Sequence, residues 1–257
     1  MNFQRKAFII KTFGLLGVQM SIVNLSETVE CLLEAVLQKK TGYVCVTGVH
    51  GIIESQDDSD LRTILNNAFL CVPDGMPTVW MGRLRGHRAI SRVYGPDLML
   101  ETMRATKNLE VRHFFYGGAP GIAEELRSKL KNLYSGLQIV GCYCPPFRPL
   151  NADEFLNLKM QVTACKPDII WVGLSTPKQE RFMADALTQL DTSLMIGVGA
   201  AFDFHTGRVR QAPRWIRQTG LEWLYRLIQE PKRLWRRYLN IVPRFLWLVL
   251  LSVFKKS

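Results

Sequence analysis

The fold is decided by Val111-Arg112-His113-Phe114-Phe115-Tyr116-Gly117-Gly118-Ala119-Pro120-Gly121, which an amphipathic run at residues 122–133 follows. The aromatic residues predict a buried strand, the glycines predict a tight turn, and the run after them predicts a helix. A strand, a glycine turn and a helix in this order form the mononucleotide-binding unit of α/β proteins. The full Gly-x-Gly-x-x-Gly pattern and its downstream acid are missing, so a dinucleotide site is not predicted.

Strands and helices alternate on both sides of this unit. Further buried strands are predicted at residues 43–47, 69–72, 137–144, 168–174 and 193–198, with helices between most of them. This alternation predicts a Rossmann-like α/β core over residues 1–207, in which a mainly parallel sheet has helices on both faces. Short strands are predicted near its start, at residues 13–23.

Residues 208–257 differ from the core in composition. They contain twelve Lys and Arg residues but only two acidic residues, so they carry +10 of the total charge of +11. Helices are predicted at residues 213–228 and 232–240, and Pro243 then introduces an apolar run at residues 245–254. This charge asymmetry predicts a basic helical appendage that meets an anionic surface.

The apolar run at residues 245–254 has the Trp, Phe and Leu content of an interfacial helix. A helix of this length rises only about 15 Å, against roughly 30 Å of membrane hydrocarbon. We therefore expect a tail that lies in the membrane interface without crossing the bilayer. The alternative is a helix that packs against the core.

Neither the cysteines nor the acidic residues have the spacing of a metal site. The six cysteines are scattered without a Cys-x-x-Cys pair, which is typical of reduced thiols in a cytosolic protein. Asp58-Ser59-Asp60 resembles the metal-binding Asp-x-Asp of many nucleotide-sugar transferases, but it follows polar residues and precedes a predicted helix. We therefore expect it to cap that helix, and we predict no metal ligands.

Pro73-Asp74-Gly75-Met76-Pro77 follows the predicted strand at residues 69–72. The prolines restrict φ and the glycine permits unusual φ, so this loop is built for one shape. Because ligands bind at the carboxyl ends of strands in α/β proteins, Asp74 is a candidate general base. The alternative is that Asp74 caps the helix predicted after it.

Other polar residues also follow predicted strands, and we expect them to meet Asp74 in one crevice. They are His50, Arg92, Gln179 and Asp203. The chain has no serine nucleophile elbow, Walker loop or His-x-x-x-His pair. A carboxylate, cations and glycine turns suit the displacement of a phosphate leaving group by a hydroxyl, because the carboxylate takes the proton and arginines stabilise the diphosphate. A basic interfacial tail suits a lipid acceptor.

Six motifs recur in this order in one known family. They are Pro73-Asp74-Gly75-Met76-Pro77, Arg92-Val93-Tyr94-Gly95-Pro96-Asp97-Leu98, Phe115-Tyr116-Gly117-Gly118, Pro177-Lys178-Gln179-Glu180, Gly197-Val198-Gly199-Ala200-Ala201-Phe202-Asp203 and Gly220-Leu221-Glu222-Trp223-Leu224-Tyr225-Arg226-Leu227. Each motif alone is weak, but together they are specific. From about residue 13 to residue 240, the chain resembles the WecG/TagA/CpsF family of bacterial glycosyltransferases.

The resemblance implies an inverting, metal-independent glycosyltransferase that needs no cofactor. It would move a sugar, often N-acetylmannosamine, from a UDP-sugar donor to a sugar linked to polyprenyl (undecaprenyl) diphosphate, in the synthesis of a bacterial cell-surface polysaccharide. The loop Cys144-Pro145-Pro146-Phe147 looks closer to the exopolysaccharide branch of the family. The protein would be cytoplasmic and peripheral, on the inner face of the cell membrane.

Residue roles follow from the same resemblance. Asp74 would be the general base, Arg92 would bind the diphosphate or the acceptor phosphate, and Gln179 would contact the donor. The candidate phosphate ligands of the appendage, spaced for one face of a helix, are Arg226, Arg233 and Arg237. The remaining candidates for substrate binding are Thr47, His50, Gly117, Gly118, Lys178 and Asp203.

Gly48 departs from the family, which commonly has an asparagine there, and His50 is a candidate to replace the missing amide contact. The identity of donor and acceptor is therefore left open. A different class of protein also remains an alternative, namely a non-catalytic nucleotide-binding scaffold or regulator of an envelope assembly. A nucleic-acid partner is not expected, because the aromatic residues of the tail join an aliphatic run and form no stacking platform. The sequence leaves open whether the chain forms a homo-oligomer.

Overall fold

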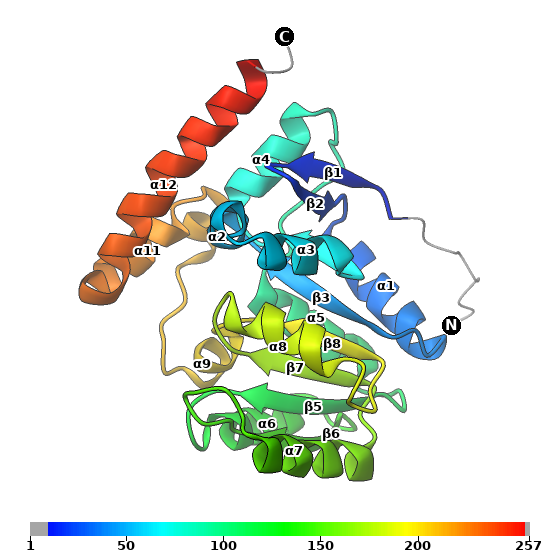
Figure 1. Ribbon diagram of the computed structural model, residues 1–257. Coiled ribbons are helices and arrows are strands. Elements are labelled where there is room, and N and C mark those ends of the chain that lie inside the picture. The colour runs from blue at the N-terminus through cyan, green and yellow to red at the C-terminus, as the bar shows by residue number, and fades with distance from the viewer. Residues whose placement is uncertain (1–9, 255–257) are drawn as a thin grey trace.

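The computed structural model describes residues 10–254, except for the side chains of Arg233, Val253 and Phe254. Within this range a sheet of six parallel strands has the order β4-β3-β8-β7-β5-β6 (Figure 1). The strands are β3 (Gly42–Thr47), β4 (Leu70–Pro73), β5 (Arg112–Gly117), β6 (Gln138–Tyr143), β7 (Ile169–Gly173) and β8 (Leu194–Gly197). The prediction of a Rossmann-like α/β fold is confirmed.

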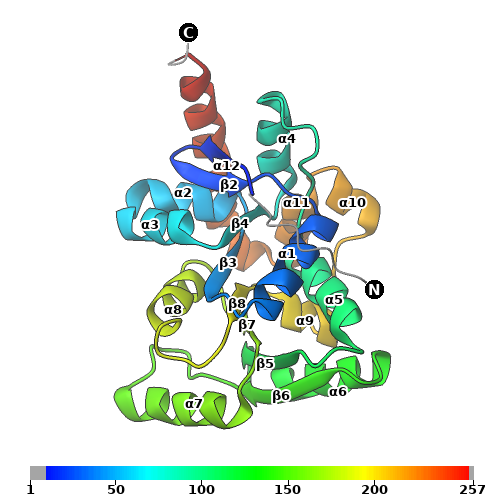
Figure 2. The same ribbon diagram turned by 90° about the vertical axis from the view of Figure 1, so that its right-hand side faces the viewer.

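Helices cover both faces of the sheet (Figure 2). On one face lie α1 (Leu25–Leu37), α5 (Gly95–Thr106), α6 (Ile122–Leu133) and α9 (Ala201–Thr206). On the other face lie α2 (Val49–Asp57), α3 (Ser59–Asn67), α7 (Ala152–Cys165) and α8 (Lys178–Ala186). The predicted strands near the start of the chain form an antiparallel hairpin, β1 (Thr12–Leu15) and β2 (Val18–Ser21), which packs with this second set of helices.

Each face of the sheet has its own apolar core, because successive side chains of a strand point in opposite directions. In β5, Phe115 belongs to the core on the α1 side, whereas Phe114 and Tyr116 belong to the core on the α8 side. Trp171 of β7 packs on the same side as Phe115. These strands are buried on both faces, so their sequences are apolar without alternation, as expected for a central parallel sheet.

The glycine turn of the mononucleotide unit depends on a close approach of two strands. Gly117 has a φ of +122°, and a Cβ atom there would lie only 2.5 Å from the carbonyl oxygen of Gly173 on β7. Gly118 follows with a φ of +77°. A larger residue at Gly117 would therefore separate β5 from β7, at the end of the sheet where a ligand is expected.

The helices of the appendage differ from the predicted ones. Residues 213–228 form two short helices, α10 (Arg214–Gln218) and α11 (Glu222–Gln229), because Gly220 turns the chain with a φ of +75°. Beyond them, α12 (Pro231–Phe254) is continuous through Pro243, so the prediction that a helix ends at residue 240 is wrong. Ile241 and Phe245 on either side of Pro243 are buried in the core, and their packing holds the helix together where one backbone hydrogen bond is lost.

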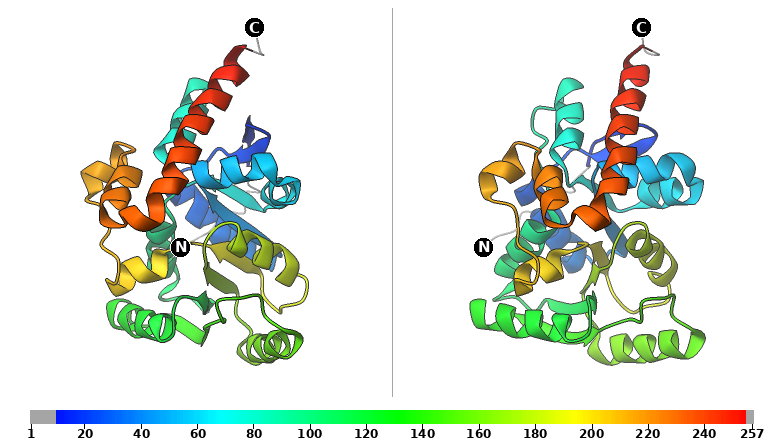
Figure 3. Two further views of the ribbon diagram at one scale, coloured as in Figure 1. Left: turned by 60° about the vertical axis from the view of Figure 1, so that its left-hand side comes forward. Right: turned by 90° about the vertical axis from the view of Figure 1, so that its left-hand side faces the viewer.

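Helix α12 packs against α2 and then extends beyond the core (Figures 1 and 3). Arg244 forms an ion pair with Asp57 at the end of α2. Helix α4 (Met76–Leu84) projects from the core toward the same end of the molecule as α12 (Figure 3). None of the helices in residues 10–254 combines the length and the apolar character that a bilayer crossing needs.

Candidate active site

A cleft of about 1700 Å³ opens at the carboxyl ends of the central strands and continues between α4 and α12. Nine of the predicted site residues line it: His50, Asp74, Arg92, Gly118, Lys178, Gln179, Asp203, Arg226 and Arg237. Thr47 and Gly117 lie in the strands just before the lining residues, and the Thr47 side chain is buried. Arg233 belongs to α12, but its side chain lies outside the described residues.

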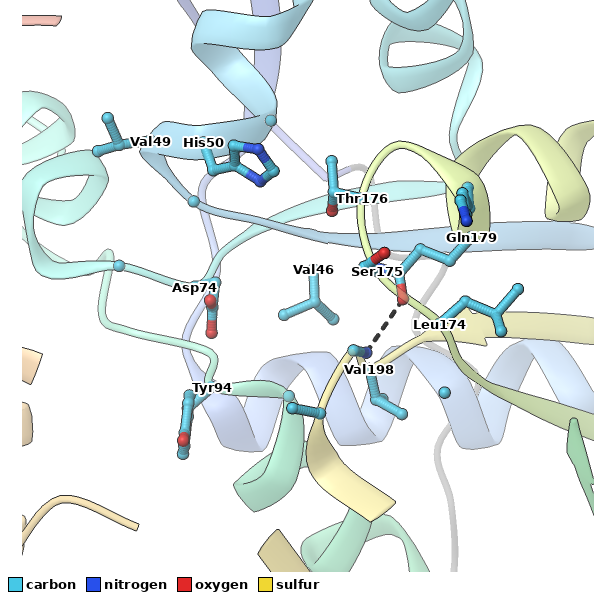
Figure 4. Close-up of a pocket in the computed structure, with 18 of the residues that line it drawn as sticks. Val46, Val49, His50, Asp74, Tyr94, Leu174, Ser175, Thr176, Gln179 and Val198 are labelled. Carbon is cyan, nitrogen blue, oxygen red and sulfur yellow. Dashed lines mark hydrogen bonds between the residues drawn. The ribbon is translucent and has the colours of Figure 1, made fainter. Parts of the chain in front are cut away.

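The Asp74 loop is held by β3 and by the start of α4. The backbone amide of Asp74 donates to the carbonyl of Thr47 at 3.1 Å, which continues the pairing of β3 with β4 by one residue. Gly75 is the N-cap residue of α4, and the Thr78 hydroxyl donates to its carbonyl at 2.6 Å. The alternative that Asp74 caps this helix is therefore wrong, and its carboxylate faces the cleft (Figure 4).

The carboxyl group of Asp74 has one buried and one accessible side. Its Oδ1 atom is buried without a hydrogen-bond partner, while the side chain keeps 35% of its surface exposed. Burial raises the pKa of Asp74 to about 6, although the charge of Arg92 opposes this rise. Near neutral pH the group is therefore mostly ionised, yet more basic than an ordinary aspartate. Such a pKa suits a general base.

Gly48 lies directly beside this carboxylate. A Cβ atom at Gly48 would be 3.7 Å from Oδ2 of Asp74, in ordinary van der Waals contact. The backbone of Gly48 is extended, with a φ of −104°, so a larger residue would fit without strain. A longer side chain at this position would therefore reach Asp74.

Arg92 connects Asp74 to the appendage. Its Nε donates to the backbone carbonyl of Asp74, its Nη1 donates to the carbonyl of Arg217 at 3.1 Å, and its Nη2 lies 2.6 Å from Oε2 of Glu222. The same Nη2 is 3.9 Å from Oδ1 of Asp74. The guanidinium also lies over the ring of Tyr94, 4.2 Å from its centroid. Arg92 is thus already bound on several sides, and a phosphate would have to share it with Glu222.

Further cations reach the cleft from the appendage. Arg226 on α11 lies over the ring of Phe204, and its Nε is buried without a hydrogen-bond partner. Burial lowers the pKa of the His50 imidazole, and the charge of Arg237 on α12 lowers it further. Glu54 opposes this shift through a contact of 3.3 Å with His50. Because Arg226 and Arg237 belong to different helices, the prediction that they share one helix face is wrong.

The Pro-Lys-Gln-Glu turn is bound into the protein rather than free. Gln179 is buried, its Oε1 accepts a hydrogen bond from the Gly199 amide at 3.0 Å (Figure 4), and its Nε2 donates to Glu180 at 3.0 Å. Glu180 is also buried, and burial raises its pKa. The bond with Gly199 fastens the start of α8 to the loop that follows β8, so Gln179 shapes the floor of the cleft.

Another cation lies in the part of the cleft near the start of α8. Lys178 places its Nζ 4.4 Å from the ring centroid of Phe147, whose side chain is 98% exposed. Next to them, Tyr116 and Phe182 stack with centroids 4.0 Å apart. This end of the cleft, beside the Gly118 turn, combines aromatic surface with positive charge. It therefore has the chemistry to hold a nucleotide.

Several residues of this site were not singled out from the sequence. Glu222, Arg217, Tyr94 and Phe147 all line the cleft, and the first three surround Arg92. Glu222 and Tyr94 belong to two of the recurring motifs. The motifs were the only indication that these two residues belong to the site. Nothing in the sequence indicates that Arg92 and Glu222, 130 positions apart, are neighbours.

The described residues contain no group of three or more His, Cys, Asp or Glu side chains arranged to hold a metal ion. Asp58, of the Asp-x-Asp sequence, accepts a hydrogen bond from the Leu61 amide at 2.9 Å and thereby caps α3. It also pairs with Arg181 at 2.5 Å. The prediction that this aspartate serves as a helix cap is confirmed.

A parallel α/β sheet with a carboxylate of raised pKa at a strand end and a cationic cleft has the arrangement of a transferase. Residues 13–257 match the family described as Glycosyl transferase WecG/TagA/CpsF, and the chain belongs to this family of glycosyltransferases. It is 32% identical over 228 residues to a protein of Bacillus subtilis (strain 168), the N-acetylglucosaminyldiphosphoundecaprenol N-acetyl-beta-D-mannosaminyltransferase. That match covers 88% of this chain and 86% of the relative.

Proposed function

We propose that this glycosyltransferase moves a sugar from a UDP-sugar to a sugar linked to polyprenyl diphosphate, with inversion at the anomeric carbon. The observation that carries the proposal is the ionisable, half-accessible Asp74 carboxylate on the wall of a cleft with cations at both ends. The name of the Bacillus relative supports the acceptor class and suggests N-acetylmannosamine as the donor sugar.

In the proposed reaction, a hydroxyl oxygen of the acceptor sugar attacks the anomeric carbon of the donor, and the bond from that carbon to the UDP oxygen breaks. Asp74 takes the hydroxyl proton and later releases it to solvent. UDP leaves with the bonding electron pair, and cationic side chains stabilise its added charge. A single displacement of this kind inverts the anomeric configuration.

The two ends of the cleft suit the two substrates. The end formed by Lys178, Phe147 and the Gly118 turn would hold the nucleotide. Arg226 and Arg237 would hold the diphosphate of the acceptor, beside Asp74. Thr47, Gly117, Gln179 and Asp203 would shape the floor between the two ends, and Arg233 would add charge at the start of α12.

We also assign the protein to the inner face of the cell membrane as a peripheral protein. Trp247, Leu250 and Leu251 on the projecting part of α12 are exposed by 60%, 50% and 38%. The appendage at residues 208–257 carries nearly all of the net charge. Exposed Trp and Leu on a basic helix favour the interface of an anionic membrane.

A donor screen tests the reaction. The protein is incubated with UDP-N-acetylmannosamine or another UDP-sugar, together with N-acetylglucosaminyl diphosphate on a short lipid. We expect release of UDP and formation of a disaccharide only when donor and acceptor are both present, also with EDTA in the buffer. Proton NMR of the product would give the anomeric configuration. Binding of UDP-sugars without any turnover would instead support the scaffold or regulator.

A further inference from the structure

Two apolar stripes face the outer part of the cleft, between α4 and α12. Helix α4 contributes Met76, Pro77, Trp80, Met81 and Leu84, and α12 contributes Ile241, Val242, Phe245, Leu246 and Val249. Within each helix these positions recur at the spacing of a single face. We call the space between them the α4–α12 groove. Along α4 it is roughly 12 Å long.

The walls of the groove are fixed, but its surface is not covered by the chain. Val79 and Phe245 are buried and anchor α4 and α12, respectively, in the core. At the rim, however, Leu84 is 80% exposed and Leu246 is 62% exposed. Apolar side chains on a projecting helix face are normally covered by a partner or by a ligand. Their exposure on both walls points to an occupant that lies along the groove.

The groove is continuous with the charged part of the cleft. Its inner end meets Asp74, Arg92, Arg226 and Arg237, which line the same cavity. Its outer end lies where α4 and α12 project together from the core (Figures 1 and 3). Cations at one end and hydrocarbon along the remainder complement a molecule with an anionic head and a linear apolar tail. A peptide is a poorer match, because these walls offer few partners for its backbone hydrogen-bonding groups.

We infer that the α4–α12 groove binds the first isoprene units of the acceptor lipid, next to the diphosphate. This assignment rests on the proposed function and adds a specificity site to it. The enzyme would then recognise the tail directly, in addition to the sugar and the diphosphate. Leu84 and Leu246 would be the residues that make acceptors with a longer tail bind better.

This assignment is tested with a series of acceptors that carry the same sugar diphosphate but tails of increasing length. Their turnover is measured in detergent solution, without a membrane. For the unaltered protein we expect kcat/KM to rise with tail length until the groove is filled, and then to level off. Leu246→Ser and Leu84→Ser should each lower kcat/KM for the long-tail acceptor by about tenfold, mainly through KM, and flatten the dependence on length. Leu239→Ser is the matched control, because Leu239 lies on the same helix with 63% exposure but does not line the cleft.

Each outcome separates this inference from the reaction on which it rests. Turnover that is independent of tail length in the unaltered protein would overturn the groove assignment and leave the proposed function intact. If Leu239→Ser and Leu246→Ser lower kcat/KM for the long-tail acceptor equally, the groove assignment is also overturned. Such a result would indicate a general effect of removing apolar surface. If no acceptor of any length is turned over, the proposed function fails and the assignment fails with it.

Discussion

Arg92 and Glu222 form an ion pair that joins the α/β core to the appendage, with Nη2 of Arg92 2.6 Å from Oε2 of Glu222. Both side chains are mostly buried, with 15% and 13% of their surfaces exposed. The same guanidinium lies next to Asp74, so the position of α11 affects the electrostatic environment of the proposed base. The appendage therefore contributes to the proposed catalytic centre as well as to the proposed membrane surface.

Replacing Asp74 by asparagine removes the proposed base with little change in shape. We expect turnover of the lipid-linked acceptor to fall by about 10²- to 10⁴-fold, because the acceptor hydroxyl loses its proton acceptor. The measurement is the initial rate of UDP release at saturating donor. Asp60→Asn, at an exposed position in the first turn of α3, is a control that should retain full activity. Turnover of Asp74→Asn within a few-fold of the unaltered protein would refute the assignment.

Asp74→Asn should lower activity but raise the free energy of unfolding at neutral pH. The pKa of Asp74 rises from 3.8 to about 6 on folding, so the folded state binds the proton more tightly. The free energy of unfolding therefore declines as the pH rises from about 4 to 6, and above pH 6 the ionised group destabilises the fold. With allowance for the exposed part of the side chain, we expect Asp74→Asn to be more stable by about 1 kcal/mol at pH 7.5.

This stability gain should vanish near pH 4, where the carboxyl group is protonated in both folded and unfolded protein. Urea unfolding of the two proteins at both pH values measures the difference. A loss of stability at pH 7.5 in Asp74→Asn would contradict the raised pKa and would show that the carboxylate contributes to the fold.

Glu222→Gln tests the link between the appendage and the base. The negative charge of Glu222 helps to raise the pKa of Asp74, so its removal should lower that pKa. The acid limb of the profile of kcat/KM against pH, expected near pH 6 in the unaltered protein, should then move to lower pH. Loss of the mostly buried ion pair should also lower the free energy of unfolding by about 2 kcal/mol. Glu230→Gln, at the end of α11, serves as the control.

An unshifted acid limb in Glu222→Gln would mean that Glu222 does not influence Asp74. If Glu222 has a purely structural role, Glu222→Gln should lower the free energy of unfolding and leave the midpoint of the pH profile unchanged. The two readouts therefore distinguish an electrostatic role from a structural one.

Membrane attachment is best tested by surface substitutions rather than by truncation. Removal of residues 242–257 would also remove Phe245, which is buried in the core, and would destabilise the protein. The triple variant Trp247→Ser, Leu250→Ser and Leu251→Ser changes side chains that are 38% to 60% exposed and keeps the buried Phe245, so we expect it to lose most of its sedimentation with anionic vesicles. Leu37→Ser, at an exposed position on α1, should sediment normally. Full sedimentation of the triple variant would exclude this surface as the anchor.

The sequence was sufficient to predict the elements whose signals are local. The strand at β5, the glycine turn and helix α6 follow from aromatic residues, from Gly117 and Gly118, and from the apolar periodicity of residues 122–133. Asp58 was predictable as a helix cap because capping involves residues only three positions apart. The family motifs also identified the Asp74 loop and several other residues that line the cleft.

Only the tertiary structure decided the features that depend on distant contacts. Pro243 predicts a break, but packing of Ile241 and Phe245 against the core keeps α12 continuous. The pairing of Arg92 with Glu222 spans 130 positions, and the raised pKa of Asp74 arises from burial that local sequence does not encode. The α4–α12 groove exists because two amphipathic helices far apart in the chain project side by side. Local patterns thus specify the helices and strands, whereas the environment of each functional group depends on which segments the fold brings together.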